Sequence, residues 1–183
     1  MIRRRVLIPT HLFAYGLLFA GSEAWFDSAS TLASAILASG LITASVTDMR
    51  RHIIPDFSSL GLVLAGLAAT WWFWPEMVAW HALAALVWFA LLAGLSEAYF
   101  RLYDRDGFGL GDAKLMAASA AWLGAVPTIS VLLYASIAGI AALLIITRFR
   151  IEKRSVRTGL AFGPYIALSI WIVWLYGVTL SGL

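Results

Sequence analysis

Two aspartates border apolar segments of this chain, where their carboxyl groups could work as a pair. Asp48 closes one apolar run and Asp112 opens another. Two carboxyl groups that share one proton can form an acid/base dyad, in which the ionised group takes a proton from water and the protonated group polarises a peptide carbonyl. Such a pair titrates as a unit, so the sequence does not assign separate roles to its two members.

Three glycines precede the second aspartate, in the stretch GFGLGDAKL at 107–115. Glycine accepts unusual backbone angles and allows another chain to approach closely. We therefore expect Gly107, Gly109 and Gly111 to let a peptide reach the carboxylate of Asp112. The simpler alternative is that each aspartate only caps a helix end.

The composition requires a bilayer around these residues. Hydrophobic residues make up 62% of the 183 residues and charged residues 13%, whereas soluble domains are about half apolar and about a quarter charged. The chain has no cysteine, which excludes disulfides, thiolate metal sites and cysteine nucleophiles. The three histidines are scattered without the spacing of metal ligands.

Apolar runs separated by short polar breaks predict an all-α, polytopic membrane bundle of about seven transmembrane helices. The chain shows no linker or internal repeat, so residues 1–183 are expected to form a single transmembrane domain. The fifth run is short, and Pro127 after Gly124 predicts a tight turn behind it. The predicted spans are Val6–Gly21, Ala29–Thr47, Phe57–Trp74, Val78–Ser96, Gly111–Gly124, Thr128–Thr147 and Ala161–Leu180.

The charged residues divide between the two sides of this topology. All 13 Lys and Arg residues fall in the segments on one side, and the other side has only Glu23, Asp27 and Glu76. Positive charge marks the cytoplasmic side, so we expect a cytoplasmic amino terminus. The basic residues are then topology signals and contacts to anionic lipid rather than a nucleic-acid surface. A cluster of tryptophans at Trp71, Trp72, Trp74 and Trp80 predicts an aromatic belt on the outer side.

The same topology brings the two aspartates to one depth, at the cytoplasmic rim. Acids at membrane depth are rare and usually mark function. Two of them on one side, one behind glycines, favour function over simple capping. The other acids have plainer explanations: Asp56 after Pro55 is expected to be an N-cap, and Glu97 a residue of the rim.

Three segments of the sequence resemble the signatures of a known family. They are DMRRHIIPD at 48–56, GLGDAKL at 109–115 and FGP at 162–164. In this order and on one side of the membrane, they resemble the type IV prepilin peptidases, which are GxGD-type intramembrane aspartyl proteases. The resemblance runs from the second span to the end of the chain.

The resemblance implies an endopeptidase of the prokaryotic inner membrane that needs no metal or cofactor. It would remove the short basic leader from type IV prepilin or pseudopilin precursors at the cytoplasmic face. Asp48 and Asp112 would be the catalytic pair. The residues implied to bind substrate or shape the site are Pro55, Gly109, Gly111, Lys114, Phe162, Gly163 and Pro164. A lysine that extends to the rim is the plainer explanation for Lys114. The loop from Glu97 to Gly111 is expected to admit the substrate.

The chain also departs from the family pattern. Longer members carry a segment with paired cysteines that is associated with methylation of the new amino terminus. This chain has no cysteine and only a short interval between its first two spans, so we expect no methyltransferase activity. Residue 161 is alanine, where the family often has proline.

Other functions are compatible with the same acids. A small proton- or ion-coupled transporter would also carry intramembrane carboxylates, but it predicts acids near the midplane and repeated halves with broken helices. A membrane scaffold would tolerate replacement of either aspartate by asparagine. A protease for a different single-pass substrate is a third possibility. The sequence leaves open the precursor, the oligomeric state and which aspartate holds the proton.

Overall fold

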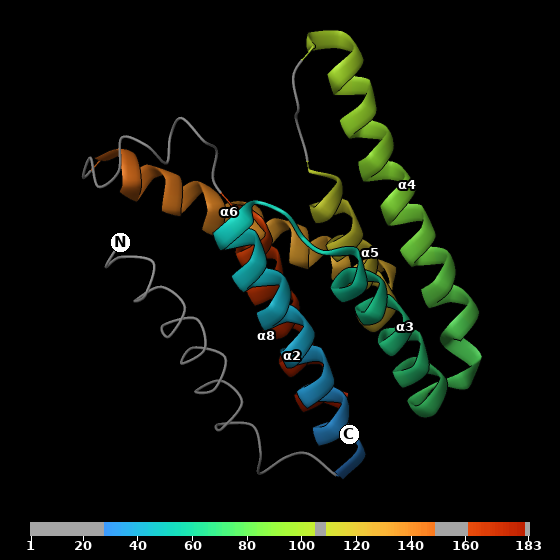
Figure 1. Cartoon of the computed structure of the whole chain (residues 1–183). Coiled ribbons are helices and arrows are strands. Elements are labelled where there is room, and N and C mark those ends of the chain that lie inside the picture. The colour runs from blue at the N-terminus through green and yellow to red at the C-terminus, as the bar shows by residue number, and fades with distance from the viewer. Residues whose placement is uncertain (1–27, 105–108, 149–160, 182–183) are drawn as a thin grey trace.

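The computed structural model of the chain describes residues 28–104, 109–148 and 161–181 (Figure 1). These residues form α-helices and one short 3-10 helix, and no strand occurs among them. The elements are α2 (Ser28–Arg51), α3 (Asp56–Phe73), η2 (Pro75–Met77), α4 (Val78–Tyr103), α5 (Leu110–Leu123), α6 (Ala125–Arg148) and α8 (Gly163–Ser181). The predicted all-α class holds throughout the described part.

The number of membrane-spanning helices agrees only in part with the prediction. Four segments are long and apolar enough to cross a bilayer, and they correspond to α2, α3, η2 with α4, and α6. Helix α8 contributes a shorter apolar segment, Gly163–Gly177. The predicted first span, Val6–Gly21, lies outside the described residues. The count of seven spans is therefore not confirmed.

The shortest of the described α-helices lies at the centre of the bundle. Helix α5 has 14 residues and packs against α3, α4, α6 and α8. Nine of its residues are buried, and five of these are alanines. Small side chains let membrane helices approach closely, because van der Waals packing rather than the hydrophobic effect holds them together. The alanine-rich surface of α5 therefore suits a helix that is surrounded by other helices.

Close packing at Gly66 and one hydrogen bond fix α5 against α3. A Cβ atom on Gly66 of α3 would lie 2.6 Å from the ring of Trp122, so only glycine fits there. The indole Nε1 of Trp122 also donates a hydrogen bond of 2.8 Å to the carbonyl of Leu62. Steric fit and a buried hydrogen bond therefore hold the carboxyl-terminal part of α5 in one position.

The turn after α5 consists of a single residue. Gly124 has φ 84°, in the left-handed region that glycine adopts without steric cost, and α6 begins at Ala125. The tight turn predicted here is confirmed, but Gly124 makes it, and Pro127 lies in the first turn of α6. From this turn α6 crosses the other helices at a steep angle (Figure 1).

Helix α4 is longer than predicted. The sequence placed its end at Ser96, yet the helix continues to Tyr103 and ends at Asp104, which has φ 51°. Glu97 and Arg101 form an exposed i,i+4 ion pair of 2.7 Å within this extension. The substrate-admitting loop predicted from Glu97 is therefore wrong up to Tyr103, because these residues are helical. Residues 105–108 lie outside the described part.

Candidate active site

Asp48 lies in the last turns of α2 and is only 7% exposed. Its Oδ2 accepts a hydrogen bond of 2.9 Å from the backbone N–H of Gly163 at the start of α8. The first N–H groups of a helix have no partner within that helix, and the helix dipole attracts negative charge to this end. The carboxylate of Asp48 therefore serves α8 as a cap supplied by another helix.

This hydrogen bond restricts where a proton can sit on Asp48. A backbone N–H can only donate, so Oδ2 is the acceptor of this bond. The bond favours Oδ1 as the site of any proton on Asp48, because a carboxyl oxygen that carries a proton is the weaker acceptor. The carboxyl group thus has one oxygen held by the fold and one left for chemistry.

Asp112 lies in the first turn of α5 and is half-buried. It lies one residue after Gly111, which packs against Ile54, and Ile54 also packs against Gly163, whose N–H binds Asp48. The structure thus places these two aspartates, from helices far apart in the sequence, at the same end of the bundle, as their predicted common depth requires. We call the end of the bundle that holds Asp48, Asp112 and Gly163 the aspartate end. The end that holds Trp74 and Met77 is the opposite end.

One apolar side chain joins the segments that carry the aspartates. Ile54, in the connection between α2 and α3, is 5% exposed. A Cβ atom on Gly111 would lie 3.1 Å from the Cβ of Ile54, and one on Gly163 would lie 3.1 Å from its Cδ1. Ile54 thus packs between the starts of α5 and α8. The sequence analysis did not select it as a site residue, because an apolar residue in a short loop has no periodic pattern.

The glycines before Asp112 matter because they leave room for neighbouring side chains, and their backbone angles are ordinary. Gly109 is the N-cap of α5 with an ordinary φ of −68°, and Gly111 is helical without a positive φ. The expectation of unusual backbone angles is wrong for these two residues. A Cβ on Gly109 would lie 3.1 Å from Oδ2 of Asp112, and Gly111 leaves room for Ile54. Gly107 lies outside the described residues.

Lys114 pairs with a carboxylate on the neighbouring helix. Its Nζ lies 2.5 Å from Oδ1 of Asp56, the first residue of α3. Asp56 makes no capping hydrogen bond, and the N-cap position belongs to Pro55. The predicted N-cap role of Asp56 is therefore wrong. Its side chain is 68% exposed, and the pair links α5 to α3 beside the aspartates.

The other predicted site residues occupy the starts of α3 and α8. The carbonyl of Pro55 accepts backbone hydrogen bonds from Ser58 and Ser59. Gly163 and Pro164 are buried in the first turn of α8. The ring of Phe162 instead packs toward α6, where a Cβ on Gly139 would lie 3.1 Å from it. Phe162 therefore holds the start of α8 from the α6 side.

A metal centre finds no support among the residues that the structure describes. They contain no group of three or more His, Asp or Glu side chains that could hold an ion. The chemistry available at the aspartate end is proton transfer by two carboxyl groups, one of which has a fixed oxygen.

Comparison with known proteins places this arrangement in a family. The profile of the Type IV leader peptidase family matches residues 35–144. A "Prepilin leader peptidase/N-methyltransferase" of Burkholderia pseudomallei is 34% identical over 163 residues, 87% of this chain and 51% of that protein. One with the same name from Stutzerimonas stutzeri is 31% identical, over 92% of this chain and 58% of that protein.

A third relative has a different name. The "Type 4 prepilin-like proteins leader peptide-processing enzyme" of Escherichia coli is 32% identical over 91% of this chain and 60% of its own length. The chain thus spans about half the length of the curated relatives it matches. No solved structure matches it. Because the family profile covers more than half of the sequence, the chain belongs to the Type IV leader peptidase family.

Proposed function

We propose that this member of the Type IV leader peptidase family is a membrane aspartyl endopeptidase that removes the basic leader from type IV prepilin-like precursors. The observation that carries the proposal is the convergence of Asp48 and Asp112 at one end of the bundle. The names of the three relatives refer to prepilin leader processing and support the choice of substrate.

In the proposed reaction, water adds to the carbonyl carbon of the scissile peptide bond. The ionised carboxylate of the pair takes a proton from that water, and the protonated carboxyl group gives its proton to the carbonyl oxygen. Transfer of a proton to the leaving nitrogen then breaks the C–N bond and yields a free carboxylate and a free amine. When Asp48 takes part, Oδ1 is its reacting oxygen, because Oδ2 accepts from Gly163.

The basic residues support a cytoplasmic position for this site. Among the described residues, Arg50 and Arg51 end α2, Arg101 lies in the last turn of α4, and Arg148 ends α6. Positive charge of this kind marks the cytoplasmic side. We therefore propose a multi-pass protein of the prokaryotic inner membrane with the aspartate end in the cytoplasm and a cytoplasmic amino terminus.

The substrate fits the aspartate end on physical grounds. A precursor with a basic leader followed by an apolar helix would lie in the bilayer with its junction at the cytoplasmic rim. A helix hides its own peptide bonds in intramolecular hydrogen bonds, so the junction has to unwind before water and the carboxyl groups can reach it.

The test is a cleavage assay in membranes with a precursor that carries a basic leader, a Gly-Phe junction and an apolar helix. The wild type is compared with Asp48→Asn and Asp112→Asn, and product masses are read by mass spectrometry. We expect each substitution to reduce cleavage at least about 100-fold, the usual size of general acid–base catalysis. The same masses report whether the new amino terminus is methylated, and we propose that it is not.

The variants also separate this proposal from its alternatives. Cleavage that survives either substitution would reject the dyad. A proton or ion flux that requires the same aspartates, without any cleavage by the wild type, would indicate a transporter. Expression and folding of each variant are checked by thermal unfolding in detergent, so that loss of structure is not mistaken for loss of chemistry.

A further inference from the structure

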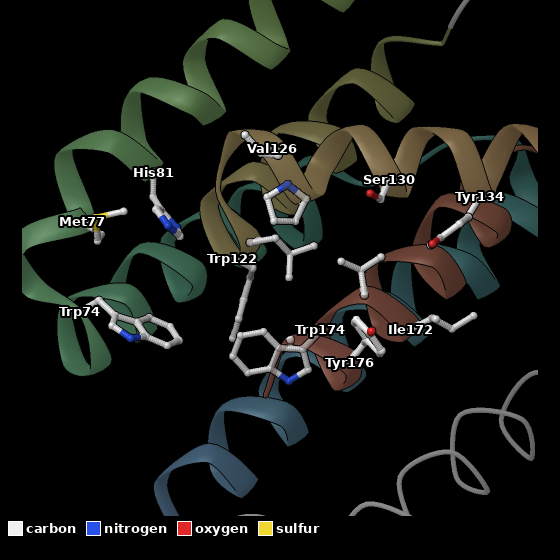
Figure 2. Close-up of a pocket in the computed structure, with 14 residues that line it drawn as sticks. Trp74, Met77, His81, Trp122, Val126, Ser130, Tyr134, Ile172, Trp174 and Tyr176 are labelled. Carbon is white, nitrogen blue, oxygen red and sulfur yellow. The ribbon is translucent and has the colours of Figure 1, made fainter. Parts of the chain in front are cut away.

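A pocket of about 710 Å³ lies between α3, α4, α5, α6 and α8, away from the aspartates (Figure 2). It is lined by Trp74, Met77 and His81 on one side and by residues of α5, α6 and α8 on the other, including Trp122, Val126 and Trp174. Trp74 follows the 18 residues of α3 that begin at Asp56, which is about 27 Å along a helix. The pocket therefore belongs to the opposite end of the bundle, and its size suits a small amphiphile.

The two tryptophans in the middle of the pocket present carbon surfaces to it. Nε1 of Trp122 donates to the carbonyl of Leu62 at 2.8 Å, and Nε1 of Trp174 donates to Oγ of Ser34 at 2.9 Å. Both N–H groups are thus bonded to other helices. The rings meet edge to face, with centroids 5.3 Å apart. These walls suit hydrocarbon.

Ser130, Tyr134 and Tyr176 also line the pocket, but His81 is the most deeply buried of its polar lining residues. His81 is 9% exposed, and its Nδ1 lies 3.0 Å from the carbonyl of Ala121. A carbonyl only accepts, so the hydrogen-bond network assigns the proton to Nδ1. The hydroxyl of Thr70, 3.2 Å from Nδ1, can give its own proton to the carbonyl of Gly66 at 3.0 Å. The Nε2 of neutral His81 is therefore a hydrogen-bond acceptor.

This acceptor faces the pocket. In Figure 2 the imidazole of His81 points from α4 into the space bordered by Trp74 and Trp122. A Cβ atom on Gly124 would lie 3.2 Å from Nε2, so the glycine at the turn keeps this nitrogen open. Within residues 28–104, 109–148 and 161–181, no hydrogen bond to Nε2 occurs. An acceptor that opens onto an apolar pocket favours a ligand that brings a donor.

The charged residues at the opposite end of the bundle indicate which chemical group of a ligand could donate to Nε2 of His81. Glu76 lies between Trp74 and Met77 in the sequence and is exposed, and the described helix ends around the pocket carry no Lys or Arg. A headgroup with net negative charge would find no cation there, whereas an ammonium group would have the exposed carboxylate of Glu76 at the same end of the bundle. Trp71, Trp72 and Trp80 are each at least 65% exposed at this end. Tryptophans of this kind favour the headgroup level of a bilayer.

We propose that this pocket binds one acyl chain of a zwitterionic phospholipid with a primary ammonium headgroup, such as phosphatidylethanolamine. The chain occupies the space between the Trp122 and Trp174 rings and α6, and an ammonium N–H donates to Nε2 of His81 near the carboxylate of Glu76. The bilayer supplies the ligand, and the site does not depend on peptidase activity.

The experiment measures lipid retained by the whole purified chain, using native mass spectrometry. The probes are phosphatidylethanolamine and phosphatidylcholine with identical acyl chains, because the two headgroups have the same net charge but only the first has N–H donors. We expect about tenfold stronger retention of phosphatidylethanolamine, the effect of one hydrogen bond to a buried acceptor. Asp112→Asn should retain it equally, so failure of the proposed peptidase function and failure of this site are distinguishable.

Three variants localise the binding. His81→Asn keeps a donor at the place of Nδ1 but lacks Nε2, and it should retain the two lipids equally. Gly177→Leu places a side chain at a pocket-lining position where nothing lies within 4 Å of a Cβ, and it should retain less of both lipids. Gly61→Leu is the matched control, since a Cβ there also meets nothing within 4 Å but Gly61 does not line the pocket.

Several results would overturn the proposal. Equal retention of both lipids by the wild type, or a preference that persists in His81→Asn, would reject the hydrogen bond to Nε2. Unchanged retention in Gly177→Leu would place the lipid elsewhere. A photo-crosslinking residue at position 126 that captures the precursor instead of lipid would assign the pocket to the precursor.

Discussion

The two ends of α5 and α8 differ in how tightly they are packed. At the aspartate end, a Cβ atom on Gly163 would lie 2.8 Å from Oδ2 of Asp48, so there is no room for a methyl group. At the opposite end the same helices border an open pocket, and a Cβ on Gly177 would meet nothing within 4 Å. Helix α5 begins at the aspartate end and stops at Leu123, where Trp122 and Leu123 border the pocket, so no further turn of α5 fills the space beyond them.

This comparison suggests that the exact positions of backbone and carboxylate atoms matter at the aspartate end, and that the volume of the pocket matters at the opposite end. At the aspartate end, glycines allow backbone and carboxylate to meet at hydrogen-bond distance. At the opposite end, aromatic rings border a space onto which the buried His81 opens. Substitutions that add or remove only a few atoms therefore test the comparison most directly.

The largest effect is expected from Gly163→Ala. The added methyl group would displace the carboxylate of Asp48 or push against Ile54, and both contacts fix the reacting groups. We expect cleavage of the precursor to fall about 100-fold, since a shift of about 1 Å in a catalytic group has this size of effect. Gly94→Ala in α4 is the control, because a Cβ there meets nothing within 4 Å. Equal activity of the two variants would show that the close approach is unimportant.

A smaller effect, on folding, separates the capping role of Asp48 from its proposed chemistry. Asp48→Ala leaves the buried N–H of Gly163 without its acceptor, and we expect this to reduce the free energy of unfolding by about 1–3 kcal/mol. Asp48→Asn retains an oxygen acceptor and should be more stable than the alanine variant, although neither should cleave. Denaturant titration in detergent gives the two stabilities. If both variants are as stable as the wild type, the cap contributes nothing.

The smallest effect is expected at the ion pair between Lys114 and Asp56. Asp56 is 68% exposed, and pairs with an exposed partner contribute about 0–1 kcal/mol. A double-mutant cycle with Lys114→Gln and Asp56→Asn measures their coupling, and kcat/KM for the precursor should fall less than about fivefold. A 100-fold loss in Lys114→Gln with an intact fold would instead show that Lys114 contacts the substrate.

The sequence predicted that Asp48 and Asp112 lie on one side of the bundle, because alternating apolar spans and one-sided basic charge determine which helix ends share a side. It did not predict Ile54, whose role depends on the spacing between α5 and α8 rather than on its own neighbours. It also ended α4 too early, because the charges of Glu97 and Arg101 resemble a loop, although at i,i+4 spacing they stabilise a helix. The Asp56 cap failed for a related reason, since Lys114 on another helix takes its carboxylate.

The pocket at the opposite end had no signal in the sequence. It depends on where α5 stops and how steeply α6 leaves the turn, and both are tertiary features. In the sequence, Trp122 is one apolar residue among many and His81 is one of three scattered histidines. Their roles at the pocket depend on the hydrogen bonds of their ring nitrogens, which only the structure shows.

The shortness of α5 has a consequence for how the protein enters the membrane. Its 14 residues extend about 21 Å, less than the roughly 30 Å of hydrocarbon that a helix must cross. We therefore expect α5 to insert poorly as an independent span during synthesis. Because a one-residue turn at Gly124 joins it to α6, we expect the two helices to insert together, before the alanine-rich surface packs against α3 and α4.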